Sequence, residues 1–280
     1  MKRIALVALA LVALASFTLY AQRVPRKSAA PAGKPASTPA ATPPATPAAA
    51  PRTERAVPFA TGETLSYDVS WSSYLTAGTV VTTVKDKRPS FNSTAYYIIA
   101  EGRPTPLLSK LYSIYYKIDT LLDSFTLLPQ RGSVYSEEGK RHRFKTTQFD
   151  RAAKKVLFEY KSDTTAKDAF ATSAVTQDAL SAIYVLRAIP MKTGDKMTMP
   201  VTDNGINYKV QLDVGAPEKV RTPMGEQPAL KIRLSVFDDK NQPVGKNIAI
   251  WMSTDARRLP VKLQADLPVG SFNLLLRDAK

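Results

Sequence analysis

The chain has 280 residues, a formal net charge of +15 and no cysteine. The absence of cysteine excludes disulfide bonds, a thiol nucleophile, a thiolate metal site and a lipid anchor on cysteine. With one histidine and no glycine-rich phosphate loop, the sequence predicts no metal, no cofactor and no catalytic residue.

Residues 1–21 have the organisation of a secretory signal peptide. Lys2 and Arg3 precede an apolar run from Ile4 to Leu19, and the small residue Ala21 marks the expected cleavage site. Because Leu19 occupies a position that prefers a small residue, an uncleaved anchor formed by residues 4–21 is the alternative. We therefore expect a periplasmic or otherwise exported protein, or one anchored in the inner membrane with its domain outside the cytoplasm.

Residues 22–57 are rich in proline and alanine and cannot bury enough apolar surface to fold, so they predict a disordered tether. Residues 1–57 carry eight basic side chains and one acidic side chain, Glu54. This charge predicts attraction of the tether to an anionic envelope surface. Nucleic acid is not an expected partner of an exported chain.

Residues 58–280 form a single predicted domain in which apolar and polar side chains alternate, as in strands with one buried face. Short turns such as residues 203–205 and 238–241 separate the strands. The sequence predicts an all-β, mainly antiparallel fold: a curved sheet, or an open β-barrel or sandwich, of about a dozen strands. The clearest alternating segments are residues 65–71, 208–214, 230–236, 248–252, 259–263 and 272–276.

Two segments interrupt the alternation. Residues 176–189 predict one longer amphipathic helix, with Thr176 or Gln177 near its N-cap and Pro190 ending it. Its apolar side chains recur at helical spacing, so one side is expected to lie on the sheet. Residues 106–112 predict a short helix or turn.

Groups able to perform catalysis are sparse. His142 lies between Arg141 and Arg143, which disfavour its charged form, and no Gly-x-Ser-x-Gly motif is present. Paired carboxylates would support a glycosidase or other hydrolase, but their spacing brings no two together. The acids considered are Glu63, Glu101, Asp119, Asp123, Asp150 and Asp178.

Aromatic side chains offer a different kind of candidate site. They could line the interior of an open barrel and hold a hydrophobic ligand, although ordinary core packing explains them as well. The predicted ligand-binding residues are Trp71, Tyr97, Tyr115, Tyr184 and Trp251.

Three blocks of the sequence carry a resemblance to a known family. They are residues 62–71 with Ala77-Gly78, residues 177–182 with Tyr184 and Arg187, and residues 251–255 with Arg258, Pro260 and Val261. In this order the blocks resemble the DUF3108 family of exported bacterial proteins, over residues 58–278. The resemblance implies an exported, mostly antiparallel β domain with one longer helix, and it implies no reaction.

The leading hypothesis is a non-enzymatic exported envelope protein whose curved sheet binds an apolar or amphipathic ligand, such as a lipid, or a partner in the envelope. A cell-envelope hydrolase or glycan-modifying enzyme is the alternative. A purely structural scaffold is the third candidate.

Overall fold

The computed structural model describes residues 52–72, 75–111, 113–267 and 270–280. The predicted signal peptide, and the predicted tether as far as residue 51, lie outside the described residues. In the part that is described, neither helix combines the length and the hydropathy needed to cross a bilayer.

The first half of the domain is a meander that starts in the middle of one large sheet. Each strand pairs antiparallel with the next, and a short helix, α1 (Pro106–Leu111), follows the third strand. The strands are β1 (Thr64–Trp71), β2 (Leu75–Ser90), β3 (Ser93–Pro104), β4 (Ile114–Asp123), β5 (Pro129–Glu138), β6 (Arg141–Asp150), β7 (Lys155–Lys161) and β8 (Thr165–Ala171).

Helix α2 (Ala179–Ala188) then carries the chain to the opposite edge of the sheet, and a second meander returns to the start. Its last strand pairs antiparallel with β1, which joins the two halves. The strands are β9 (Lys196–Asp203), β10 (Ile206–Thr222), β11 (Gly225–Phe237), β12 (Lys246–Ser253), β13 (Pro260–Leu267) and β14 (Gly270–Ala279).

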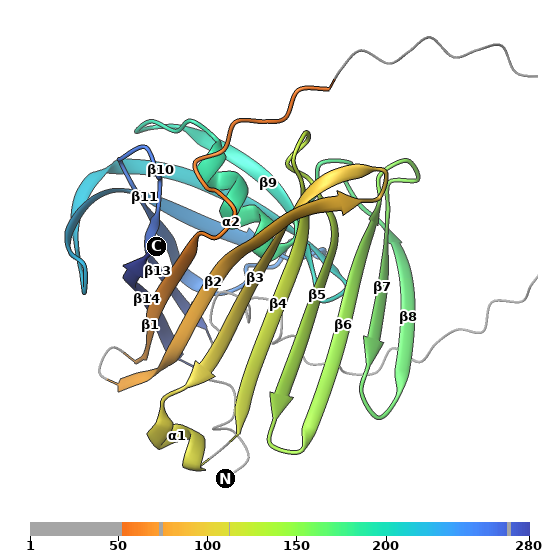
Figure 1. The fold of residues 1–280 in the computed structure, drawn as a ribbon, viewed down its shortest axis with the longest axis horizontal. Helices are drawn as coiled ribbons and strands as arrows, with labels where there is room; N and C mark the ends of the chain where they lie inside the picture. Colours follow the sequence, from red (N-terminus) through yellow and green to blue (C-terminus); the bar gives the residue numbers. More distant parts are fainter. Residues whose placement is uncertain (1–51, 73–74, 112, 268–269) are drawn as a thin grey trace, which may run out of the picture.

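The result is a 14-stranded antiparallel sheet that curls around α2 without closing into a barrel, since its edge strands β8 and β9 are not paired with each other (Figure 1). This confirms the predicted fold class, an all-β open curved sheet with one longer helix. The concave face carries the core. In β1, for example, Leu65, Tyr67 and Val69 are buried while their neighbours are half-exposed, as the alternation predicts.

Helix α2 begins three residues later than the sequence analysis predicts. Its N-cap is Asp178, whose carboxylate accepts a hydrogen bond from the Ser181 N–H at 2.7 Å. The Ser181 hydroxyl accepts in return from the Asp178 N–H, which completes a capping box. Gln177 instead pairs with Val201 of β9, so it continues the sheet rather than the helix.

Asn207 of β10 links the second meander to the end of the edge strand β8. Its side-chain amide donates to the Ala171 carbonyl at 2.8 Å, and its side-chain oxygen accepts from Thr172 and Thr202. These hydrogen bonds hold the two edges of the curved sheet together near the segment that leads into α2.

The last six residues of the predicted tether, 52–57, lie against the domain. Glu54 forms an ion pair with Lys87 and accepts a hydrogen bond from Ser124, and the Arg55 N–H donates to the Ser124 carbonyl. The described part of the chain therefore begins close to the β4–β5 turn.

Candidate functional site

Two small cavities lie on the concave face, on either side of the inward surface of α2. Their volumes are about 80 Å³ and about 90 Å³. Both are bordered by Ala179, Ile183 and Asp203, so the two cavities are neighbours that meet beside the first turns of the helix.

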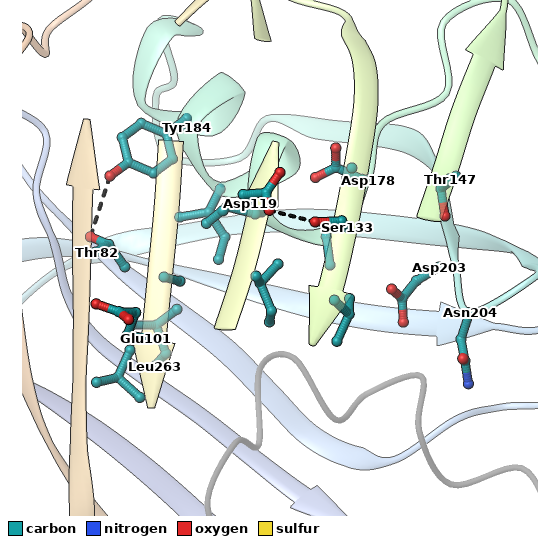
Figure 2. Close-up of a pocket in the computed structure, with 18 of the residues that line it drawn as sticks. Thr82, Glu101, Asp119, Ser133, Thr147, Asp178, Tyr184, Asp203, Asn204 and Leu263 are labelled. Atoms are coloured by element: carbon teal, nitrogen blue, oxygen red, sulfur yellow. Dashed lines mark hydrogen bonds between the residues drawn. The ribbon is translucent and has the colours of Figure 1, made fainter. Parts of the chain in front are cut away.

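Apolar side chains line most of this space. Leu263, Leu274 and Ile118 border the first cavity, and Leu212 and Ile250 border the second. Figure 2 shows polar side chains along the first cavity: Asp203, Asn204 and Thr147 gather at one end, and Glu101 lies with Leu263 toward the other. The walls are therefore largely apolar, with polar groups at both ends.

Asp203 is placed at the polar end by the tight turn between β9 and β10. Asn204 and Gly205 both have positive φ, 53° and 78°, which is typical of a two-residue hairpin turn. Asp203 lies two residues after the buried Val201 and four after the buried Met199, so its side chain points to the same, concave face of the sheet. Burial raises the pKa of Asp203 to about 7.

Lys145 of β6 supplies a cation to the same end of the cavity. It pairs across the sheet with Val134, which packs against the core, so the lysine faces inward. Burial lowers the pKa of Lys145, and the nearby Asp203 partly offsets this. Among the described residues, no carboxylate lies within 4.0 Å of the Lys145 ammonium group.

Tyr208 of β10 borders the second cavity. The side chain is 6% exposed, and its hydroxyl group has no hydrogen-bond partner among the described residues. Buried hydroxyl groups are normally paired, so this one marks a place where a polar partner would be stabilising. Burial raises the pKa of Tyr208, and the acids Asp203 and Asp238 add to the effect.

Asp178 also borders the first cavity, but its oxygens are used by the fold. It caps α2 and accepts a hydrogen bond from the Thr120 hydroxyl at 2.5 Å. Burial is the largest influence on the pKa of Asp178 and raises it. The carboxylate therefore has a structural role at the start of the helix.

Asp119 and Glu101 contact the first cavity from strands whose alternation turns their side chains the other way. Thr120 faces the helix cap, so the neighbouring Asp119 faces the convex side, where it binds Ser133 and Arg131. Glu101 likewise accepts a hydrogen bond from Tyr115. The acids that enter the cavity with their carboxyl groups are Asp178 and Asp203.

The five aromatic residues predicted to line a pocket are not brought together. Tyr184 of α2 borders the first cavity and donates a hydrogen bond to Thr82, and burial raises the pKa of its hydroxyl to about 12. Trp71 packs in a separate small cluster with Phe272 and Ala77.

Tyr97 and Tyr115 lie on the convex face. The Arg88 guanidinium lies 4.2 Å from the Tyr97 ring centroid, and the Arg103 guanidinium lies 4.6 Å from that of Tyr115. Burial and the neighbouring Glu101 raise the pKa of Tyr115 to about 12. These rings are covered by arginine rather than open to the interior.

Trp251 is 3% exposed and lies on the opposite side of β12 from Ile250, which borders the second cavity. The ammonium groups of Lys231 and Lys262 lie 4.9 Å and 4.4 Å from its ring, and its indole N–H donates to Glu218. Trp251 therefore makes cation–π contacts on the side of the sheet that faces away from the second cavity.

The polar residues that face the cavity, Lys145, Asp203 and Tyr208, are absent from the candidates that the sequence suggests. A signal was present: Asp203 ends the alternating series begun by Met199 and Val201, at a position where an apolar side chain is expected. A polar residue at an inward position is a stronger indicator of a site than an aromatic one.

His142 lies in the β5–β6 hairpin just after the turn at Gly139, largely exposed, with Tyr135 and Glu137 beside it. No group of three or more His, Asp or Glu side chains within the described residues is arranged to hold a metal ion.

The three blocks that carry the family resemblance meet around α2. The buried Arg187 makes two hydrogen bonds to Glu63, at 2.5 and 2.8 Å, and donates to the carbonyl groups of Pro58 and Arg257. Arg258 in turn donates to the Arg187 carbonyl. The blocks therefore fasten the helix across the sheet.

The glycines of the first block lie where a side chain would be strained or would clash. Gly62 has a positive φ of 91° in a turn. A Cβ atom on Gly78 would lie 2.3 Å from the Arg103 carbonyl oxygen, so the two strands approach too closely for a side chain.

Comparisons with solved structures give distant likenesses. A beta-barrel-like protein of the DUF1849 domain of unknown function from Brucella abortus has 12% identity and a TM-score of 0.49, covering 81% of this chain and 98% of that one. A candidate lipoprotein from Parabacteroides distasonis has 8% identity and a TM-score of 0.37, with 81% and 100% coverage. A candidate exported protein with a YmcC-like fold from Bacteroides fragilis has 12% identity and a TM-score of 0.33, with the same coverage.

No curated protein matches the chain. The sequence model of the family described as protein of unknown function, DUF3108, matches residues 66–277, which is most of the described domain. The chain belongs to the DUF3108 family.

Proposed function

We propose that the protein is an exported, non-enzymatic envelope protein that binds an apolar or amphipathic ligand between α2 and the concave face of the sheet. The observation that carries the proposal is the pair of largely apolar cavities beside Ile183, with the inward-facing Lys145 and Asp203 at one end of the first. Binding sites for small molecules combine mostly apolar walls with a few placed polar groups in this way. The predicted signal peptide supports the location outside the cytoplasm.

The cavities limit the size of the ligand. An engineered cavity of about 150 Å³ holds a benzene molecule, so spaces of about 80 and 90 Å³ each hold only part of an alkyl chain. A whole alkyl chain would have to occupy both cavities and shift α2 outward.

An open groove beside the C-terminal half of α2 is the proposed access route. This groove of about 670 Å³ runs between the helix, the β4–β5 turn and the start of β9, with Val185, Leu127 and Met199 among its walls. Met199 also borders the second cavity, and its unbranched side chain adapts easily to a different rotamer. Rotation of Met199 would connect the groove with the interior.

The hydrolase alternative draws on Asp178 and Asp203, two acids with raised pKa values that border one cavity. Such pairs occur in active sites. Asp178, however, is committed to the cap of α2 and to Thr120, which leaves Asp203 as the single available acid. This arrangement supports binding more strongly than acid–base catalysis.

The test is native mass spectrometry of the full chain purified from its own envelope, with extraction and analysis of bound lipid. A co-purifying alkyl-chain compound is expected. Ala179→Leu, which fills the space between the two cavities, should abolish its retention, whereas Ala169→Leu on the exposed strand β8 should not. Ile183→Phe serves as a second filling variant if Ala179→Leu does not fold.

Retention of the same compound by all three variants, each with a normal melting curve, would contradict the proposal. A wild-type chain that carries no compound and takes up none would favour the structural scaffold.

A further inference from the structure

We propose that the ligand is a single-chain amphiphile with a carboxylate head group, and that Lys145, Asp203 and Tyr208 bind this head. The inference rests on the proposed function, because it assigns the polar end of the same cavity.

The polar end holds one cation that lacks a close partner. Lys145 points toward the concave interior from β6, and among the described residues it makes no ion pair within 4.0 Å. A half-buried ammonium group without a counter-ion is costly, and a bound anion would compensate it. The missing partner is therefore a negatively charged group.

Tyr208 provides an independent observation. Its hydroxyl is buried, has no partner among the described residues, and belongs to a side chain that borders the cavity shared with Asp203. A carboxylate has two oxygens, so one can accept from Lys145 and the other from Tyr208. A head group placed beside Asp203 would thus satisfy both unpaired donors.

Asp203 would oppose an anion if it were ionised, so its protonation state matters. The groups that face it are Lys145 from β6, Asp178 from the start of α2 and Tyr208 from β10; Asp238, near the end of β11, faces Tyr208. The pKa of Asp203 is about 7, because the carboxyl group is removed from water. Below this pH, Asp203 carries a proton that it can donate to the ligand carboxylate; above this pH, it repels the ligand.

The cavity also selects the rest of the ligand. Beyond Asp203, the first cavity continues between Leu180 of α2 and Leu263 and Leu274 of the sheet, all of which are apolar. Because this cavity is small, the alkyl chain would also enter the second cavity as α2 shifts outward. A fatty-acid-like molecule fits both ends, whereas a neutral amphiphile fits only the apolar end.

The test measures binding of decanoate and decanol, which have equal chain lengths, to the full chain by calorimetry. Near pH 6, decanoate is expected to bind about tenfold more tightly than decanol, since one charge-assisted contact is worth roughly this factor. Lys145→Gln should remove that advantage and leave decanol binding unchanged. Tyr208→Phe should weaken decanoate binding several-fold while the melting temperature stays equal or rises, because it deletes an unpaired hydroxyl.

The pH profile supplies a second readout. Decanoate affinity should fall as the pH rises through about 7 in the wild type, and it should stay high in Asp203→Asn. Equal binding of decanoate and decanol, together with no effect of Lys145→Gln, would overturn the head-group assignment and leave the cavity proposal standing. If neither compound binds the wild-type chain, the proposed function fails as well.

Discussion

The ion pair between Arg187 and Glu63 gives the sharpest prediction about stability. The Arg187 side chain is completely buried and the Glu63 side chain is 7% exposed. The guanidinium group binds both carboxylate oxygens and two backbone carbonyls, and it lies 5.3 Å from the ring centroids of Phe59 and Tyr184. Replacing Arg187 with methionine preserves most of the volume but leaves the Glu63 charge in the core.

The expected loss follows from that orphaned charge. Removing one partner of a buried ion pair typically costs about 3–5 kcal/mol. For a domain of this size, each kcal/mol lowers the melting temperature by roughly 2–4 °C, so Arg187→Met should melt roughly 6–20 °C below the wild type. The Arg257 guanidinium, 4.0 Å from the same carboxylate, keeps the loss from being larger.

The assay is unfolding of the full chain by urea and by heat, followed by tryptophan fluorescence and circular dichroism. Arg277→Met is the matched control, because the Arg277–Asp68 pair is partly exposed and should contribute no more than about 1 kcal/mol. The double variant Glu63→Leu/Arg187→Met should recover most of the lost stability, since no buried charge remains. If Arg187→Met were as stable as Arg277→Met, the argument that the Arg187–Glu63 pair fastens α2 would be refuted.

Three further predictions concern the fold around the cavity. The folded state holds the pKa of Asp203 at about 7, above its ordinary value of 3.8, so between these pH values the folded chain retains a proton that the unfolded chain loses. The free energy of unfolding should therefore fall between about pH 4 and pH 7, by a few kcal/mol at most. Urea titrations at stepped pH measure this slope, and Asp203→Asn should reduce it. Gly78→Ala should cost more than about 2 kcal/mol in the same assay, because its Cβ would meet the Arg103 carbonyl oxygen at 2.3 Å, and a loss below about 0.5 kcal/mol would show that the strands can separate. Asp178→Ala should remove about 1–2 kcal/mol and lower the helical signal in circular dichroism, whereas Asp178→Asn, which still accepts from Ser181, should lose less.

The sheet could be predicted where burial is one-sided. The series Leu65, Tyr67 and Val69 alternates with half-exposed residues, and the structure places those three in the core. Strand β8, by contrast, is exposed along almost its whole length, so no alternation marks it in the sequence. Its pairing with β7 comes from backbone hydrogen bonds, which leave little trace in the choice of side chains.

The start of α2 was predicted too early for a related reason. Thr176 and Asp178 are both favoured N-cap residues, so N-cap preference alone does not choose between them. The choice is made by a long-range contact: Gln177 pairs with Val201 of β9, so the first residue free to cap the helix is Asp178.

The predicted aromatic residues lie at separate places because aromatic side chains pack on either face of a sheet. Tyr97 and Tyr115 cover the convex side under arginine, and Trp251 packs between two lysines. The sequence does not say which face of the sheet each of these side chains occupies. Once the face is known, a polar residue that points inward, such as Asp203, indicates the site more directly.

Family membership and ligand recognition rest on different residues. The three blocks that carry the resemblance contribute Glu63, Arg187 and Asp178, which fasten and cap α2 over the concave face. Lys145 and Asp203, at the polar end of the cavity, lie outside those blocks. The framework therefore holds the helix in place without using the groups proposed to bind the ligand. A change at Lys145 is expected to alter which head group is accepted while the attachment of α2 stays intact, whereas a change at Arg187 is expected to weaken that attachment and so to reduce the binding of every ligand.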